Sequence, residues 1–353
     1  MTKPMESGKY QRKIKKYFKR RKLLLASPSN KLALKKADLS QLVSVTAPIA
    51  LISQIQRSGG SLLSQLFDFH PQLHAHPHEL KIGYPKKYIW PDLNLKQSPN
   101  RWFNILFEES VIRHLQEGYK KEPTSDTTFP FVFVPYLQKR IFFDYLAKLH
   151  SIQLRDIFNA YMTSYFGAWI DNKNYSGDKK FITGFTPRLS EKQINMKMFF
   201  EIYPDGRLIS IIRNPKNWFP SALRHNQKIK KDKYSDIYTA LVQWKQNSEA
   251  MVKNKERFNE KVCIIRFEDL IQKTEGVMKY LSQFLEIEYN QILLTPTFNG
   301  TPIAANTSFD DDKEGIIRKT VERHKTLSSE EIEIIEQETR FIYDQVLKQA
   351  ERF

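Results

Sequence analysis

Cysteine is nearly absent from this sequence, and the chain also lacks the patterns of a membrane protein. Its 353 residues include a single cysteine, Cys263, which excludes a disulfide framework and a cysteine-rich metal site. Cys263 lies in the apolar run 262–265, so we expect a buried, inert thiol. No apolar run reaches the roughly 18 residues of a transmembrane helix, and no signal-peptide pattern is present. These absences predict a soluble, cytoplasmic protein.

Acidic residues are scarce at the N-terminus. Residues 1–36 contain thirteen Lys or Arg and one acid, Glu6, so they carry +12 of the net charge of +17. We therefore predict a basic arm over residues 1–40 and a single α/β domain over residues 41–353. The arm is either a solvated tail or an amphipathic helix that contacts an anionic membrane surface. Specific binding to nucleic acid is not expected.

The most informative stretch combines a strand, a glycine-rich loop and a helix. The apolar run 49–55 is typical of a strand buried on both faces. The loop 56–60 follows, and apolar residues at helical spacing begin after Ser61. Such an arrangement binds phosphate through backbone N–H groups, and glycine lets the backbone come close to the anion. Arg57 adds a planar cation suited to oxyanions.

The loop lacks the lysine of a Walker A motif. That motif places Lys directly before Ser or Thr, whereas Gly60 precedes Ser61 here and the cation lies earlier, at Arg57. A P-loop kinase or NTPase therefore stays an alternative that lacks its defining residue. A non-catalytic basic protein that binds membrane or nucleic acid through its arm is a second alternative.

A second motif lies far along the chain. An apolar strand, 207–212, ends at Arg213, Pro215 suits the first turn of the next helix, and Ser221 follows eight residues after Arg213. Taken alone, Arg213 is best interpreted as an ion-pair residue at a strand end.

Both motifs resemble those of the PAPS-dependent sulfotransferases of the carbohydrate and tyrosylprotein type. The resemblance rests on four features: Arg57-Ser-Gly-Gly-Ser61, Asp68-Phe-His70-Pro71, Glu79, and the Arg213…Ser221 pair. The chain resembles a bacterial-like soluble member of that family, from about residue 48 to residue 345. It departs at Gly60 and Ser61, where the family usually has two Thr, so one hydroxyl is lost and Ser61 would have to make that contact. It also departs at Asn214, where the family usually has Asp, and at Phe185, where the family usually has Lys before Thr186-Pro187. Arg188 is the candidate cation to replace that lysine.

The resemblance implies a fold, a donor and a set of binding residues. The fold would be a P-loop-like three-layer α/β structure with a central, mainly parallel sheet flanked by helices. The donor would be PAPS (3′-phosphoadenosine 5′-phosphosulfate), which leaves adenosine 3′,5′-bisphosphate (PAP) as the product. The cofactor-binding residues it implies are Arg57, Ser58, Gly59, Gly60 and Ser61 at the 5′ end, with Arg213, Ser221 and Lys319 at the 3′-phosphate.

The implied reaction is in-line transfer of the sulfuryl group to an acceptor hydroxyl, which needs a general base. Glu79 is the predicted base, with His78 and His76 as alternatives, and Arg57 would stabilise charge on the 5′-phosphate. His74, His76 and His78 alternate in a loop that contains Pro77, but no carboxylate except Glu79 supports a metal site, and none is expected. The acceptor is predicted to be a glycan or glycolipid.

Apolar periodicity predicts the remaining elements. The expected helices and strands are a helical segment 142–170, a strand 181–187, helices 190–202 and 234–258, a strand 261–267, a helix to about 285, and a closing helix 330–351. Residues 81–130 show no clear period, and we interpret them as a substrate-facing insertion or a surface-packing loop.

Overall fold

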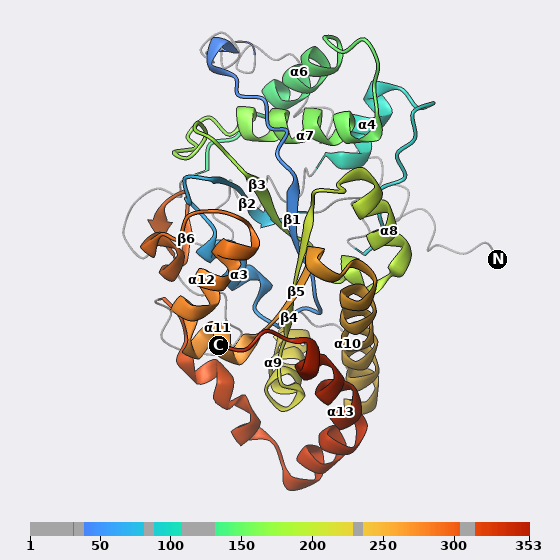
Figure 1. The fold of residues 1–353 in the computed structure, drawn as a ribbon, viewed down its shortest axis with the longest axis vertical. Coiled ribbons are helices and arrows are strands. Elements are labelled where there is room, and N and C mark those ends of the chain that lie inside the picture. The colour runs from blue at the N-terminus through green and yellow to red at the C-terminus, as the bar shows by residue number, and fades with distance from the viewer. Residues whose placement is uncertain (1–30, 32–38, 81–87, 108–130, 229–235, 304–314) are drawn as a thin grey trace, which may run out of the picture. The chain divides into compact units, whose positions relative to one another are not determined.

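A computed structural model describes residues 31, 39–80, 88–107, 131–228, 236–303 and 315–353 (Figure 1). Almost all of the predicted basic arm, and most of the predicted insertion, lie outside the described residues. The described chain forms two compact units. The smaller unit takes its residues from the segments up to Thr46, 93–107 and 131–175, and the larger unit contains the rest. The single domain over 41–353 stays a prediction.

The smaller unit is helical. Its described elements are the 3₁₀ helix η1 (Leu39–Gln41) and the helices α4 (Pro99–Leu106), α6 (Pro135–Leu146) and α7 (Leu154–Ala168). The single helical segment expected over 142–170 is wrong, because Gln153 and Asp156 form a capping box that starts α7 anew. Aromatic side chains contribute to the core of this unit, since Phe142, Phe158 and Tyr165 are all buried.

The larger unit is built on a five-stranded parallel sheet in the order β2-β3-β1-β4-β5. Its strands are β1 (Ile49–Ile52), β2 (Leu73–Glu79), β3 (Phe181–Phe185), β4 (Arg207–Ile212) and β5 (Val262–Arg266). The prediction of a loop around Pro77 is wrong, because these residues form strand β2. Proline is tolerated there since β2 is an edge strand, and its pairing with β3 shifts register between Ala75 and Glu79.

Helices cover both faces of this sheet, so the predicted three-layer fold is confirmed (Figure 1). One core contains α3 (Gly60–Leu66), α11 (Phe267–Gln272) and α12 (Thr274–Phe284); the other contains α9 (Pro215–Lys228), α10 (Ile237–Phe258) and α13 (Ser329–Gln349). Alternate residues of β5 supply the two cores, with Cys263 and Ile265 in the first and Ile264 in the second. Cys263 is fully buried, as expected, and burial raises the pKa of its thiol.

Smaller elements connect these layers. They are η2 (Leu189–Glu191), α8 (Gln193–Ile202), η3 (Asn259–Lys261), η4 (Gln291–Leu294), the hairpin β6 (Thr297–Phe298) and β7 (Thr301–Pro302), and η5 (Arg318–Thr326). Across the part of the chain described here, no helix combines the length and the apolar character needed to cross a membrane.

Candidate functional site

The carboxyl ends of the parallel strands carry most of the predicted site residues. Arg57 lies in the loop after β1, Glu79 ends β2, and Arg213 directly follows β4. In open α/β sheets, ligands bind at this edge. The strand order places β1 between β3 and β4, so the loop after β1 is flanked by Phe185 at the end of β3 and by Arg213.

The loop after β1 has an unusual backbone. Arg57 has a φ of 70° and Gly59 a φ of 95°, both in the left-handed region. A residue with a side chain adopts this region rarely, and such strain concentrates at functional sites. Glycine is required at position 59 for a second reason, because a Cβ there would lie 2.5 Å from Cδ2 of Phe267. The conformation of the loop therefore requires glycine at position 59.

Several polar atoms of this loop are buried without a hydrogen-bond partner among the described residues. They include Nε of Arg57 and Oγ of Ser58, which is only 1% exposed. Burial lowers the pKa of Arg57 to about 10, so the guanidinium is still charged at neutral pH. Ser61, in the first turn of α3, is half-buried. Buried donors without partners beside a charged guanidinium fit an anionic ligand.

Arg213 lies against the same loop. Its Nη1 donates to the carbonyl oxygen of Arg57 at 2.7 Å, and its Nη2 donates to the carbonyl oxygen of Thr320 at 2.7 Å. The guanidinium stacks over the Phe267 ring, with 4.4 Å from Cζ to the ring centroid. The structure therefore brings the two predicted motifs together, with Phe267 packed against both Gly59 and Arg213.

The electrostatic surroundings of Arg213 suit an anion. Its side chain is 4% exposed, and burial lowers its pKa to about 9. That value includes the carboxylate of Glu268, which raises the pKa, and the positive charges of Arg57 and Arg323, which lower it. The guanidinium groups of Arg57 and Arg323 thus repel that of Arg213, and an anion bound beside Arg213 would relieve this repulsion.

The helix η5 supplies one cation that the sequence did not indicate. Thr320 is bonded to Arg213, and Oδ1 of Asn217 accepts a 2.9 Å bond from the backbone N–H of His324. These contacts hold η5 against α9, so Arg323 is half-buried and lowers the pKa of Arg213. Lys319, the predicted candidate, is exposed. No pattern in the sequence distinguishes these two basic residues, because η5 is short and polar.

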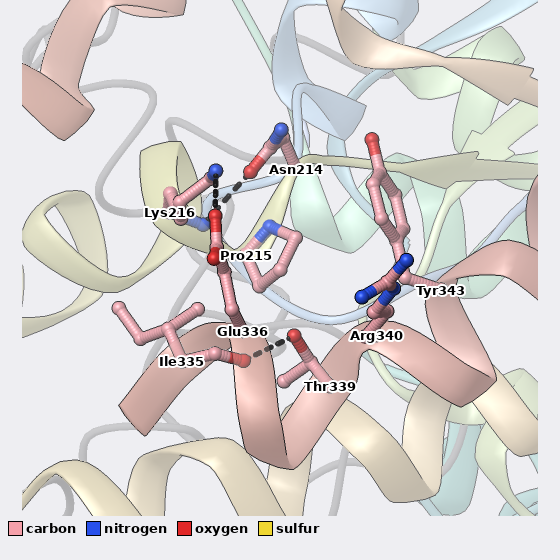
Figure 2. A pocket seen from close by; sticks show the side chains of 8 residues that line it. All are labelled: Asn214, Pro215, Lys216, Ile335, Glu336, Thr339, Arg340 and Tyr343. Atoms are coloured by element: carbon pink, nitrogen blue, oxygen red, sulfur yellow. Dashed lines mark hydrogen bonds and ion pairs between the residues drawn. The ribbon is translucent and has the colours of Figure 1, made fainter. Parts of the chain in front are cut away.

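Ser221 lies on α9 and is 3% exposed. The start of the same helix lines a pocket on the α13 side, shown in Figure 2. Its lining residues are Asn214, Pro215, Lys216, Ile335, Glu336, Thr339, Arg340 and Tyr343. Lys216 and Glu336 form a 2.6 Å ion pair within this pocket, so the charges of these two lining residues already neutralise each other. The residues of the loop 57–61 do not line this pocket, and we assign it no ligand.

Glu79 and His78 lie at the end of β2. Both side chains are half-buried, and the backbone N–H of Glu79 donates to Nδ1 of His78 at 2.6 Å. His76 is buried, and its Nδ1 lies 2.9 Å from the carbonyl oxygen of His78. Because a carbonyl oxygen only accepts, His76 carries its proton on Nδ1. Among the described residues, no three His, Cys, Asp or Glu side chains are grouped as metal ligands.

Gly60 and Phe185, two of the departures from the family pattern, are neighbours in space. A Cβ on Gly60 would overlap the ring of Phe185 and Nε2 of Gln54. Arg188, the candidate replacement cation, has a bidentate ion pair with Glu191, at 2.7 and 3.1 Å. Its guanidinium also lies 5.4 Å from the ring centroid of Tyr88. The charge of Arg188 is therefore already balanced.

Comparisons with known proteins agree on one family. A family model described as "Sulfotransferase family" matches residues 48–291, more than half of the chain. No curated protein matches significantly in sequence. Solved structures with some similarity include the sulfotransferase domain from the curacin biosynthetic pathway, at 14% identity and a TM-score of 0.46, covering 84% of this chain and 99% of that one.

A sulfotransferase from Alicyclobacillus acidocaldarius is 13% identical with a TM-score of 0.46, covering 87% of this chain and 98% of that one. Retinol dehydratase, solved with androsterone and inactive cofactor PAP, is 12% identical with a TM-score of 0.38, covering 91% and 87%. These TM-scores lie below 0.5, so the assignment depends on the family model. The chain belongs to the sulfotransferase family, the PAPS-dependent enzymes that its sequence resembles.

Proposed function

We propose that this enzyme transfers the sulfuryl group of PAPS to a hydroxyl group of a carbohydrate or glycolipid, with Glu79 as the general base. The observation that carries the proposal is the 2.7 Å bond from Nη1 of Arg213 to the carbonyl oxygen of Arg57. It joins the two motifs from which the donor was predicted. The carbohydrate acceptor is supported by the resemblance of the loop 57–61 to the carbohydrate and tyrosylprotein branch of the family.

The chain's own residues have separate roles in this proposal. Arg57, Ser58 and the backbone N–H groups of 59–61 hold the 5′-phosphosulfate end, and Arg57 stabilises the charge that develops on the 5′-phosphate. One such donor lowers the barrier by about 3 kcal/mol. Arg213, Ser221 and a cation of η5 hold the 3′-phosphate. A nucleotide without that phosphate would leave buried cations unpaired and would bind weakly.

PAPS supplies an activated sulfuryl group whose leaving group is PAP. A hydroxyl is a weak nucleophile until its proton is removed, so the acceptor needs a base beside it. Glu79 is half-buried at the carboxyl edge of the sheet, paired in register with Phe185 of β3. In our proposal its carboxylate takes the acceptor proton, and His78 is the alternative base. No metal ion is needed, because the arginines supply the charge stabilisation.

The proposal is tested by calorimetric titration with PAP, 5′-AMP and ADP in EDTA. We expect tight, metal-independent binding of PAP and at least 100-fold weaker binding of the two nucleotides that lack a 3′-phosphate. Equal binding of ADP and PAP would contradict the proposal. An acceptor screen with labelled PAPS, over glycans, glycolipids and tyrosine peptides, then identifies the hydroxyl.

The location and the arm are separate proposals. We propose a cytoplasmic enzyme whose N-terminal residues 1–36 contact anionic membrane, because they carry +12 of the net charge. Co-sedimentation with vesicles tests the proposed contact between residues 1–36 and the membrane. The full chain should bind vesicles that contain phosphatidylserine and not neutral vesicles, and a chain without residues 1–36 should bind neither. Binding that survives the deletion would contradict this role of the arm.

A further inference from the structure

Gln54, the second residue after β1, has an unexplained side chain. It is fully buried, at 0% exposure. Neither its amide nitrogen nor its amide oxygen has a hydrogen-bond partner among the described residues. The backbone carbonyl oxygen of Gln54, in contrast, has a partner, because it accepts a 2.9 Å hydrogen bond from the N–H of Arg188. Burying an amide without a partner is unfavourable, so a group of this kind calls for an explanation.

The position of the amide points to the phosphate loop. A Cβ added to Gly60 would overlap Nε2 of Gln54, so the amide occupies the space that a side chain at position 60 would fill. Gly60 stands where the family pattern has threonine. The missing side-chain donor at position 60 and the unpartnered donor of Gln54 therefore lie at the same place.

The neighbours of this amide strengthen the case for a ligand. Nε of Arg57 and Oγ of Ser58, three and four residues further along, are also buried without partners among the described residues. The ring of Phe185 lies on the same side of Gly60 and is 5% exposed, so it forms an apolar wall. A hydrogen bond formed beside such a wall is stronger than one in water.

We propose that the carboxamide N–H of Gln54 donates a hydrogen bond to the 5′-phosphate of the donor nucleotide, in place of the hydroxyl that is absent at Gly60. Gln54 is then a further binding residue of the site. This inference depends on the proposed function, since it assumes a nucleotide with a 5′-phosphate in the loop.

The test compares the wild-type enzyme with Gln54→Leu, which keeps the size of the side chain and removes its donor. Each protein is titrated calorimetrically with PAP and with adenosine 3′-monophosphate, which lacks the 5′-phosphate. We expect Gln54→Leu to bind PAP roughly tenfold more weakly, the effect of one hydrogen bond to a charged group. Its affinity for adenosine 3′-monophosphate should equal that of the wild type.

Gln138 offers a matched control. It lies on α6, is 0% exposed, and both its amide atoms lack partners among the described residues. Gln138→Leu should leave the affinity for PAP unchanged. If Gln54→Leu binds PAP as the wild type does, or weakens both ligands equally, the role of Gln54 is wrong while the proposed function stands. If the wild type itself does not bind PAP, the proposed function fails.

A measurement on the wild type covers the case in which Gln54→Leu does not fold. The side-chain amide signals of enzyme labelled with ¹⁵N-glutamine are recorded with each ligand, and Gln54→Glu identifies the signal of Gln54. PAP should shift this signal, and adenosine 3′-monophosphate should not. If the Gln54 signal does not shift with PAP, or shifts equally with both ligands, the proposal is wrong.

Discussion

Nη1 of Arg213 donates a 2.7 Å hydrogen bond to the carbonyl oxygen of Arg57, 156 residues away in the chain. The bond joins the end of β4 to the loop after the neighbouring strand β1. In the proposed function, Arg213 is therefore more than a cation for one phosphate group. It also holds the loop that would carry the other end of the nucleotide, so its loss should affect ligands at both ends.

Arg213→Ala should weaken binding of PAP by about 100-fold, because it removes hydrogen bonds from a charged group and a buried cation. Arg213→Lys should have an intermediate affinity, because a single ammonium cannot reproduce the planar fork that spans two carbonyl oxygens. Calorimetry measures both. Arg207→Ala, at the other end of β4, is the control; that side chain pairs with Glu286 at 3.2 Å. If Arg207→Ala weakened PAP binding more than Arg213→Ala, this assignment would be contradicted.

Glu79→Gln should lower kcat by about two to four orders of magnitude, because the general base is lost while the shape is kept. The affinity for PAP should not change, since no role in nucleotide binding is proposed for Glu79. The measurement is steady-state kinetics with the acceptor found in the screen. His78→Gln is the comparison, because His78 Nδ1 accepts the backbone N–H of Glu79 at 2.6 Å. A fully active Glu79→Gln with an inactive His78→Gln would assign the base to His78.

The fold was largely predictable because buried parallel strands leave apolar runs in the sequence. The runs at 49–52, 207–212 and 262–266 are of this kind, and each became a strand. The strand β2 was not predictable in the same way. It is an edge strand with three histidines and Pro77, so neither its composition nor its periodicity indicated a strand.

The candidate site was predictable only where a local motif carries the proposed chemistry. The loop 57–61 and the pair Arg213 and Ser221 are short patterns that a sequence displays directly. The place of Arg323 depends instead on long-range contacts, such as the bond from His324 to Asn217 across 107 residues. The orphaned amide of Gln54 likewise depends on packing against Gly60, which no sequence spacing encodes.

Gly59→Ala should destabilise the protein more than Gly177→Ala. The two glycines have nearly equal φ angles, 95° and 101°, so the backbone strain of an alanine is the same, about 1–2 kcal/mol. A Cβ at Gly177 would meet only the carbonyl oxygen of Pro71 at 3.9 Å, whereas one at Gly59 would overlap the Phe267 ring. That overlap adds roughly 1–3 kcal/mol. Denaturant unfolding measures both, and equal losses would contradict the steric role of Phe267.

Glu268 makes stability depend on pH. Burial raises the pKa of its carboxyl group, although bonds from its own backbone and from Asn214, and the charges of Arg213 and Arg266, oppose this. A carboxyl with a raised pKa in the folded state contributes stability below its unfolded pKa and loses it as pH rises through the folded value. Glu268→Gln removes this dependence. Its free energy of unfolding, relative to wild type, should therefore increase with pH, and a constant difference would contradict the raised pKa.

Arg323→Ala should weaken PAP binding roughly tenfold, whereas Lys319→Ala should change it less than about twofold. The two residues share η5, but Arg323 is half-buried and its charge acts on Arg213, while Lys319 is exposed. Arg318→Ala, exposed on the same helix, is the control. Titration with 5′-AMP separates the two ends of the site, because its weak affinity should be equal in all three variants. If Lys319→Ala had the larger effect, the assignment of Lys319 to the 3′-phosphate, which the sequence suggested, would be favoured instead. This exposed lysine would then have to close onto the bound phosphate.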